Sequence, residues 1–272
     1  APAQVTRFRA YLAEFALAPG TIDIYVHQLK RADEEGGILA RLKSGAIAPK
    51  TKRLVRAAAR HYTTWSKNDK LRAAMERIRL PAPRRQKAKV PLEKAALFQV
   101  QDEIDSDPKI APAVRATLGL MAWRGFRLSD VLRMKRTEIK AALKGGTLSY
   151  MAKGQRQLEF RVNATWREFL VLLDKQSGNW ARVEDLVAGS KTAKTRRATA
   201  GRVVQRALGR IGKRLAIGDL HPHRLRRTYC VEYLRALTGD AEALVKLQQH
   251  MQWASLATAM EYVDHARGSA LE

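Results

Sequence analysis

The chain has 272 residues, of which 51 are Lys or Arg and 26 are Asp or Glu, so its formal net charge is +25. This length predicts about two domains, and a content of 46% apolar and 7% aromatic residues excludes disorder as a description of the whole chain. The excess of positive charge indicates nucleic acid as the first partner to consider, because each cation that neutralises a phosphate releases condensed counterions.

The first 80 residues predict a small helical domain. Apolar side chains recur there at helical spacing, which indicates four or five helices separated at Pro and Gly residues. Thr21 and Thr51 are the expected N-caps of two of these helices, because a side-chain oxygen can accept a hydrogen bond from the unpaired amides of a first turn.

Residues 81–91, with the sequence PAPRRQKAKVP, predict a linker between two domains. Three prolines and the lack of helical periodicity exclude a regular helix or strand. The segment has no acidic residue, and its four basic residues are candidates for contact with a phosphate backbone: Arg84, Arg85, Lys87 and Lys89. An ordinary solvated linker is the alternative.

The remaining residues, 92–272, predict a larger domain that begins with helices. Apolar periodicity predicts helices over Leu92–Asp105 and Ala111–Arg124. A further helix is expected over Leu128–Met134, starting close to Ser129.

A β-hairpin is expected next. Two short runs of alternating character, Leu148–Ala152 and Gln157–Val162, flank a turn that contains Lys153. The rest of the chain is expected to be mostly helical.

The content of cysteine and of apolar runs bears on the compartment. Cys230 is the single cysteine, so it forms no internal disulfide, which fits a reducing compartment. No uninterrupted apolar run approaches the ~20 residues that span a bilayer, and the first apolar stretch lacks a signal-peptide cleavage pattern. We therefore expect a cytoplasmic protein with no membrane partner.

Three local patterns carry the functional prediction: GFRLSD at Gly125–Asp130, HRLRRT at His223–Thr228, and the segment Trp253–Tyr262. In this order, and with a hairpin lysine between the first two, they resemble the catalytic signature of the tyrosine recombinases, the phage integrase family. That signature is G-x-R-x-S-E/D, a hairpin Lys, H-x-x-R, and a His or Trp nine residues before a nucleophilic Tyr. Trp253 and Tyr262 have this spacing, and Trp at this position resembles a minority of the family.

The resemblance implies how a phosphodiester would be cleaved. Arg127 and Arg226 would hold its non-bridging oxygens, because guanidinium groups can bind both oxygens without a metal. Tyr262 would attack, since a phenolate is a good leaving group and the covalent intermediate reverses easily. Lys153 would protonate the departing 5′ oxygen as a general acid, with Lys144 as the alternative lysine.

Further residues have supporting roles in this interpretation. His223 would donate to the phosphate or help to take the tyrosine proton, and Trp253 could donate through its indole nitrogen. Asp130 would orient active-site groups, although an ion pair with Arg127 one turn away is the local alternative. His250 stands twelve residues before Tyr262, so Trp253 is preferred to it.

Several other side chains fit a structural role better than a catalytic one. Tyr229, Cys230 and Tyr233 follow the apolar pattern of a helix and are expected in the core. His221 and His223 stand two residues apart, but Pro222 and the lack of further clustered ligands argue against a metal site.

A long basic stretch over residues 191–214 has nine Lys or Arg and no acidic residue. A solvated face is the ordinary explanation for such a run. Beside the recombinase signature we expect it to follow DNA phosphates, and to contain a helix that reads the DNA sequence. The candidate DNA contacts are Lys191, Lys194, Arg196, Arg197 and Arg202.

The resemblance implies a mainly α fold with a small β-sheet, arranged as a two-domain clamp on double-stranded DNA. A helical core DNA-binding domain (1–80) and the basic linker (81–91) would precede a mixed α/β catalytic domain (92–272). The implied reaction is site-specific recombination through a 3′-phosphotyrosine and a Holliday junction. It would occur in a homotetramer on synapsed DNA, without a metal or nucleotide cofactor.

Partners and rival functions follow from the same resemblance. An accessory DNA-bending or directionality protein is a conceivable further partner, and a bacterial or phage source would imply association with the nucleoid. The nearest enzymatic alternative is a type IB topoisomerase-like enzyme that relaxes DNA. A catalytically silent DNA-binding protein of the same fold is the alternative from another class.

Overall fold

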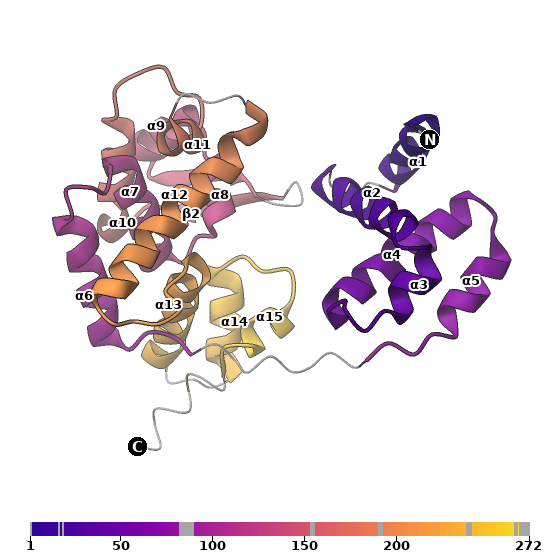
Figure 1. Cartoon of the computed structure of the whole chain (residues 1–272). Helices are drawn as coiled ribbons and strands as arrows, with labels where there is room; N and C mark the ends of the chain where they lie inside the picture. The colour runs from indigo at the N-terminus through magenta and orange to yellow at the C-terminus, as the bar shows by residue number, and fades with distance from the viewer. Residues whose placement is uncertain are drawn as a thin grey trace. The chain divides into compact units, whose positions relative to one another are not determined.

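The computed structural model describes residues 2–15, 17, 19–81, 90–152, 156–189, 193–237, 241–263 and 266. The chain divides into two compact units, residues 1–88 and 89–272 (Figure 1). Both units are built mainly from helices, and the second also contains a small sheet. The fold class expected from the sequence, mainly α with a small β-sheet, is therefore confirmed.

The first unit is helical throughout its described residues. Its helices are α1 (Pro2–Glu14), α2 (Pro19–Glu34), α3 (Ile38–Lys43), α4 (Pro49–Trp65) and α5 (Asp69–Glu76). Phe8, Leu12 and Val26 form one core cluster, against which Tyr62 and Trp65 pack. A second, smaller cluster lies around Leu42, Val55, Ala59 and Met75. Aromatic side chains thus supply much of the first of these clusters.

The two N-caps expected in this unit are wrong. Thr21 and Thr51 lie inside helices that begin two residues earlier, each at a proline. Ala48 is the N-cap of α4, and Pro49 takes the first helical position, where its missing amide hydrogen has no intrahelical partner to lose. A side chain does cap α5, where the Asn68 amide oxygen accepts a backbone N–H at 3.0 Å.

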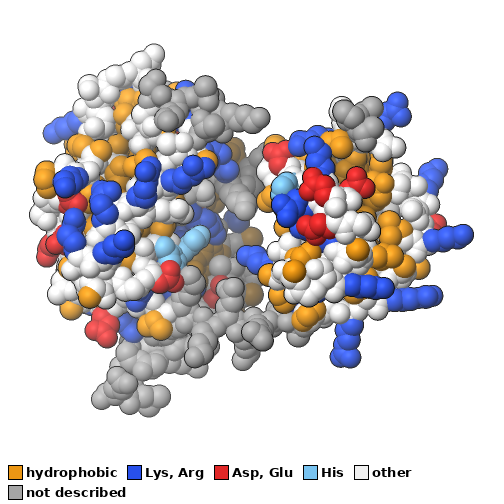
Figure 2. All heavy atoms as spheres, viewed as in Figure 1, with side chains coloured by type: hydrophobic (Ala, Val, Ile, Leu, Met, Phe, Trp, Pro, Cys, Tyr) orange, Lys and Arg blue, Asp and Glu red, His pale blue; other side chains and the backbone are white. Residues whose placement is uncertain are grey.

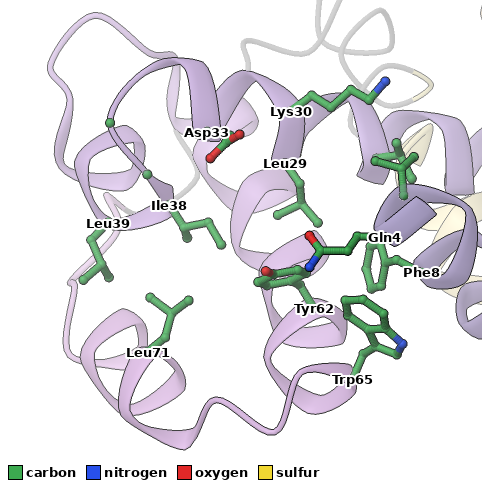
Figure 3. A pocket seen from close by; sticks show the side chains of 14 residues that line it. Gln4, Phe8, Leu29, Lys30, Asp33, Ile38, Leu39, Tyr62, Trp65 and Leu71 are labelled. Carbon is green, nitrogen blue, oxygen red and sulfur yellow. The ribbon is translucent and has the colours of Figure 1, made fainter. Parts of the chain in front are cut away.

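An apolar pocket of about 450 Å³ lies within the first unit. Figure 3 shows Phe8, Tyr62 and Trp65 together on one side of it, with Ile38 and Leu71 further along. Lys30 and Asp33 of α2 are the charged side chains of its lining.

The second unit contains most of the helices. They are α6 (Lys94–Ser106), α7 (Pro112–Arg124), α8 (Leu128–Arg133), α9 (Arg136–Gly145), α10 (Ala164–Asp174), α11 (Val183–Ala188), α12 (Ala193–Arg214), α13 (Pro222–Ala236), α14 (Ala241–His250) and α15 (Leu256–Met260). The helices expected at Leu92–Asp105, Ala111–Arg124 and Leu128–Met134 are present as α6, α7 and α8. Their ends differ from expectation by one or two residues.

Helix α7 is the central element of this unit. Its side chains are buried around most of its circumference, as is typical of a helix inside a core. It packs against α10 and α13. Gly119 allows the close approach to α10, because a Cβ at this position would lie 2.3 Å from the ring of Phe169.

The sheet of the second unit is one antiparallel hairpin. Strand β1 (Thr147–Met151) pairs with β2 (Gln157–Arg161), with Tyr150 opposite Leu158. Alternate side chains point into the core, as the period of two in the sequence predicted. The buried ones are Leu148, Tyr150, Leu158 and Phe160.

Surface charge and hydropathy complete the description. Lys and Arg side chains are spread over the visible surfaces of both units in Figure 2, as the net charge of the sequence requires. None of the helices in the described part of the chain is both long and apolar enough to cross a membrane.

Candidate active site

The site begins at Gly125, which ends α7 in a left-handed conformation with φ 69°. Glycine is the residue that adopts this conformation without steric cost. A side chain would also meet the ring of Tyr229, which lies 2.4 Å from the position of a Cβ. The turn at Gly125 leads the chain through Phe126 and Arg127 directly into α8.

Arg127 stands at the N-cap of α8 and contacts Asp130 one turn later. Its Nη1 lies 3.7 Å from Oδ2 of Asp130, and the Ser129 hydroxyl donates to Oδ1 of the same carboxylate at 3.3 Å. The Asp130 side chain is 2% exposed, whereas that of Arg127 is 37% exposed. A buried carboxylate thus tethers a guanidinium that reaches the surface, which fits both the orienting role and the ion pair considered for Asp130.

Helix α13 carries the second basic group. Arg226 is buried, and its Nη1 donates to the carbonyl oxygen of Gly125. Burial lowers the pKa of Arg226, and the charge of Arg127 acts in the same direction. The two guanidinium groups are therefore close enough to repel each other, so an anion between them would relieve that repulsion.

The two histidines at the start of α13 differ in their surroundings. His221 is the N-cap of the helix, where its Nδ1 accepts the backbone N–H of Arg224 at 3.2 Å. His223 is exposed in the first turn, three residues and so about one helical turn before Arg226. The sequence predicted no metal site at this pair, and the capping role of His221 explains the residue in another way.

Trp253 and Tyr262 flank α15 in the sequence and lie face to face in the structure. Their rings are stacked, with centroids 5.4 Å apart and planes inclined by 13°. The guanidinium carbon of Arg226 lies 5.5 Å from the centre of the Trp253 ring. The indole Nε1–H of Trp253 is buried and has no hydrogen-bond partner among the described residues, so it is an unused donor beside the arginines.

Tyr262 is held as a neutral phenol. Burial raises its pKa, while the nearby charges of Arg226 and Arg227 lower it only in part. Its side chain packs against the cluster that contains Cys230, and burial raises the pKa of the Cys230 thiol to about 11. A phenol with a raised pKa needs a proton acceptor before it can attack as a nucleophile.

A pocket of about 350 Å³ lies beside these groups. Arg127 and Trp253 line it, together with Arg156, Ser255 and Thr258. Arg156 was not singled out in the sequence, although the turn KGQR has a basic residue at each end and so signals two candidates. Gln252, which also lines the pocket, carries no sequence signal for a role there.

His250 belongs to a partly buried cluster with Arg124 and Tyr229. Arg124 donates to its backbone oxygen and contacts its Nε2, both at 2.8 Å, and the Tyr229 hydroxyl lies 2.6 Å from the same nitrogen. Burial and the charge of Arg124 lower the pKa of His250 from 6.5 to about 4. Arg124 also lies over the Phe160 ring at 4.4 Å. The cluster thus anchors the end of α14 to α7 and α13.

Some predicted site residues lie outside the described residues, among them Lys153. The same holds for Lys191, for the side chain of Lys194, and for the basic residues of the predicted linker, Arg84, Arg85, Lys87 and Lys89. Lys144, the alternative lysine, is exposed in the last turn of α9. The structure therefore does not choose between the two lysines.

The basic stretch forms most of α12, and its arginines fall into two groups. Arg196 pairs with Asp185 at 2.5 Å and Arg197 with Glu184 at 2.7 Å, so acidic groups of α11 offset their charge. Further along the helix, Arg202, Arg206 and Arg210 are exposed at spacings of four residues and share one face. In Figure 2, Lys and Arg side chains gather over the region where Figure 1 places α12.

Among the described residues, no group of three or more His, Cys, Asp or Glu side chains could hold a metal ion. The groups that converge are instead two guanidiniums, an indole and a phenol. Such a set can bind a phosphate group and place a nucleophile beside it.

Comparisons with known proteins identify the family and the fold of this chain. The model of the phage integrase family matches residues 92–268. Among solved structures, a lambda integrase dimer bound to a COC′ core site matches with a TM-score of 0.64 and 17% identity, over 98% of this chain and 77% of that one. The Tn1549 transposon integrase in complex with circular intermediate DNA matches with a TM-score of 0.61 and 15% identity, over 98% and 99%.

A third structure, the XerH site-specific recombinase bound to its palindromic difH substrate in a post-cleavage complex, matches with a TM-score of 0.60. Its identity is 17%, over 92% of this chain and 78% of that one. At these identities the likeness concerns the fold. A search of curated proteins found no match.

Proposed function

The chain belongs to the phage integrase family, and from this premise we propose that it is a site-specific recombinase that cleaves and rejoins duplex DNA. The observation that carries the proposal is the convergence of Arg127, Arg226, Trp253 and Tyr262. Arg127 stands 99 residues before Arg226 in the sequence. Arg127 and Trp253 nevertheless line one pocket, and Trp253 contacts both Arg226 and Tyr262.

The arginines would bind the scissile phosphate. Arg226 is fixed by its bond to the Gly125 carbonyl and has further N–H groups to offer, and Arg127 reaches the pocket from its tether at Asp130. As an oxygen attacks phosphorus, charge accumulates on the non-bridging oxygens, which preorganised donors stabilise most strongly in a site with little water. The unpaired Nε1–H of Trp253 would add one more donor.

Tyr262 would supply the nucleophile. Its phenolic oxygen would form a bond to phosphorus while the bond from phosphorus to the 5′ oxygen breaks, leaving a 3′-phosphotyrosine. The phenolic proton would pass to His223 or to water, and Lys153 would protonate the 5′ oxygen. The phosphodiester energy is kept in the intermediate, so resealing needs no nucleotide.

Strand exchange would follow when the free 5′ hydroxyl of a partner strand attacks the phosphotyrosine. Two such exchanges through a Holliday junction need four active sites, which is the reason to propose a homotetramer on synapsed DNA. The two-domain clamp, the candidate phosphate contacts on the linker and on α12, and the cytoplasmic location stay predictions.

The test is capture of the covalent intermediate. Wild-type protein and Tyr262→Phe are incubated with fragments of host and mobile-element DNA, the mixtures are denatured with detergent, and the attached DNA is sequenced. The proposal predicts adducts at discrete sites from the wild type only, linked through the 3′ phosphate.

Two outcomes would favour the rival functions. Tight DNA binding without an adduct, identical in the wild type and Tyr262→Phe, would indicate a silent DNA-binding protein. Adducts accompanied by relaxation of supercoiled DNA, but never by joining of two different DNAs, would indicate a topoisomerase-like enzyme.

A further inference from the structure

The hairpin of the second unit has a free edge. In an antiparallel pair, residues that exchange backbone hydrogen bonds alternate with residues whose N–H and C=O groups point away from the partner strand. Ala152 donates to Arg156 and Val162 donates to Gly146, each at 2.8 Å. With this register, Glu159 lies opposite Ser149 at a position that points away from β1. Its backbone groups therefore face outward, and in the described part of the chain no third strand pairs with this edge.

The side chain of Gln252 occupies this edge. Its Oε1 accepts the backbone N–H of Glu159 at 3.3 Å, and its Nε2 donates to the carbonyl oxygen of the same residue. A primary amide can do both at once because it has a donor and an acceptor side by side, as a peptide group of a neighbouring strand would. The Gln252 backbone oxygen also accepts from the Arg156 guanidinium at 3.3 Å.

The backbone at Gln252 is unusual for a residue with a side chain. Its φ is 50°, in the left-handed region that favours glycine. Gln252 is the second residue after α14, which ends at His250. The backbone N–H of the next residue, Trp253, donates to the carbonyl oxygen of Gln248 at 3.0 Å. The residue thus directs the chain out of α14 and places its own amide on β2 in the same turn.

We infer that Gln252 is a positioning residue that fixes the hairpin carrying Lys153 against the segment carrying Trp253. Its three hydrogen bonds join Arg156 and Glu159 of the hairpin to the residue next to Trp253, so the placement of the described hairpin residues beside the pocket that Arg156 lines depends on them. The inference rests on the proposed function, because it assigns Gln252 an effect on proton delivery to the leaving 5′ oxygen.

The test compares Gln252→Gly with Gln157→Ala. Glycine removes the amide and still accepts the left-handed conformation, so the backbone path is kept. Gln157 lies on the same strand and donates to Ser149 within the hairpin at 2.9 Å. Its replacement removes an amide without touching the segment of Trp253, which makes it the matched control.

Two DNA substrates separate positioning from general damage. One has the ordinary 5′ oxygen at the cleaved bond, and the other has sulfur in its place. A thiol has a pKa of about 8.5, so the sulfur departs as a thiolate without a proton from a general acid. We expect Gln252→Gly to form the covalent adduct about 10- to 100-fold more slowly than the wild type on the oxygen substrate. On the sulfur substrate we expect the rates of adduct formation of these two proteins to agree within about 2-fold. The control Gln157→Ala should form the adduct at the wild-type rate on both substrates.

Each other outcome has a defined meaning. Equal slowing of Gln252→Gly on both substrates, or no slowing on either, would overturn the inference while the wild-type adduct leaves the proposed function intact. Absence of a wild-type adduct on both substrates would overturn the proposed function and this inference with it.

Hydrogen exchange provides a readout that needs no reaction. In the wild type the Glu159 amide is bonded to Gln252, so it is expected to exchange more slowly than an open edge amide. Gln252→Gly should accelerate exchange at Glu159, whereas Gln157→Ala should leave it unchanged. Equal exchange of this amide in the wild type and Gln252→Gly would show that the contact does not hold the hairpin.

Discussion

The Cys230 thiol illustrates how burial in the second unit suppresses ordinary reactivity. It is fully buried under Tyr262, and burial raises its pKa to about 11. Because the thiolate is the species that reacts with alkylating agents, very little reactive sulfur exists in the folded protein near neutral pH. We expect iodoacetamide at mildly alkaline pH to leave the folded protein unmodified and to label it once urea has unfolded it, as measured by intact mass. Rapid labelling of the folded protein would contradict the burial of this side chain.

His250 gives the second unit a pH-dependent stability. The folded pKa is about 4, whereas an unfolded histidine titrates near 6.5. Between these values the unfolded state binds more protons, so the free energy of unfolding falls as the pH falls through this window. Above it the ring is neutral in both states and contributes no dependence.

The measurement is urea unfolding at a series of pH values, with His250→Gln as the comparison. The variant should lose less stability than the wild type between pH 6.5 and 4, because it has no ring to protonate. The pKa values of Asp107 and Asp185 are lowered from 3.8, so protonation of these carboxylates reduces stability below about pH 3.8, outside this window. Parallel pH profiles for the two proteins would show that another group controls the loss.

Residue types and spacing predicted four side chains that lie near one another in the structure. Trp253 contacts Arg226 and Tyr262, and it lines a pocket with Arg127. The catalytic roles of these residues, and those of Lys153 and His223, stay predictions. Gln252 could not be predicted, because its role depends on which strand edge lies opposite it. That information exists only once the segment after α14 meets the hairpin in the folded chain.

At the scale of elements, the contact between α7 and α10 depends on a missing side chain. A Cβ on Gly119 would lie 2.3–2.5 Å from atoms of the Phe169 ring, so the helices must separate or the ring must move. We expect Gly119→Ala to reduce the free energy of unfolding by about 1–3 kcal/mol, the usual cost of overpacking a core. Chemical denaturation measures the difference.

Gly209 on α12 supplies the control for this substitution. Nothing lies within 4 Å of a Cβ built there, and alanine is the better helix former. Gly209→Ala should therefore increase the free energy of unfolding by about 0.5–1 kcal/mol. A loss of stability at both positions would mean that helix packing is not the cause at Gly119.

The exposed arginines of α12 lead to a prediction about DNA binding. Arg202, Arg206 and Arg210 share one exposed face, and each one that neutralises a phosphate adds about 0.9 to the slope of log affinity against log salt concentration. Replacing all three with Ala should lower both affinity and slope in a titration with duplex DNA. Arg167 is exposed on α10, and Lys175 is exposed directly after that helix. Replacing both with Ala should change the slope little. If the slope falls by the same amount per charge removed in both variants, the net charge of the protein and not the position of the arginines controls DNA binding.

Element existence followed from the sequence more reliably than element ends. The hairpin and the helices α6, α7 and α8 were expected because their periods of 2 and 3.6 are strong, and each occurs within two residues of the expected bounds. The prediction of N-caps at Thr21 and Thr51 was wrong. Both helices begin two residues earlier, at a proline, which is favoured at the first helical position.

At the scale of the whole molecule, the two units have separate cores. Among the described residues, the clusters around Phe8 and Leu42 contain only side chains of the first unit, and the other two clusters only those of the second. Stability is therefore expected to be a property of each unit rather than of the chain.

Leu12→Ala tests this independence. Leu12 is fully buried, and its truncation should reduce the stability of the first unit by about 2–5 kcal/mol through lost burial and a residual cavity. Hydrogen exchange in urea, followed by peptide mass, should show earlier opening of peptides from residues 1–88. Peptides from the second unit should open at the same urea concentration as in the wild type, and a common shift would mean that the units unfold together.

Gly125 also limits which substitutions this protein can accept during evolution. Its position needs a left-handed backbone, its carbonyl receives Arg226, and the space a side chain would occupy is filled by Tyr229. A lineage could change Tyr229 to a smaller residue and still face the backbone requirement, so no single replacement frees the position. We therefore expect relatives with this arrangement to keep glycine at position 125, a restriction set by sterics rather than by catalytic chemistry.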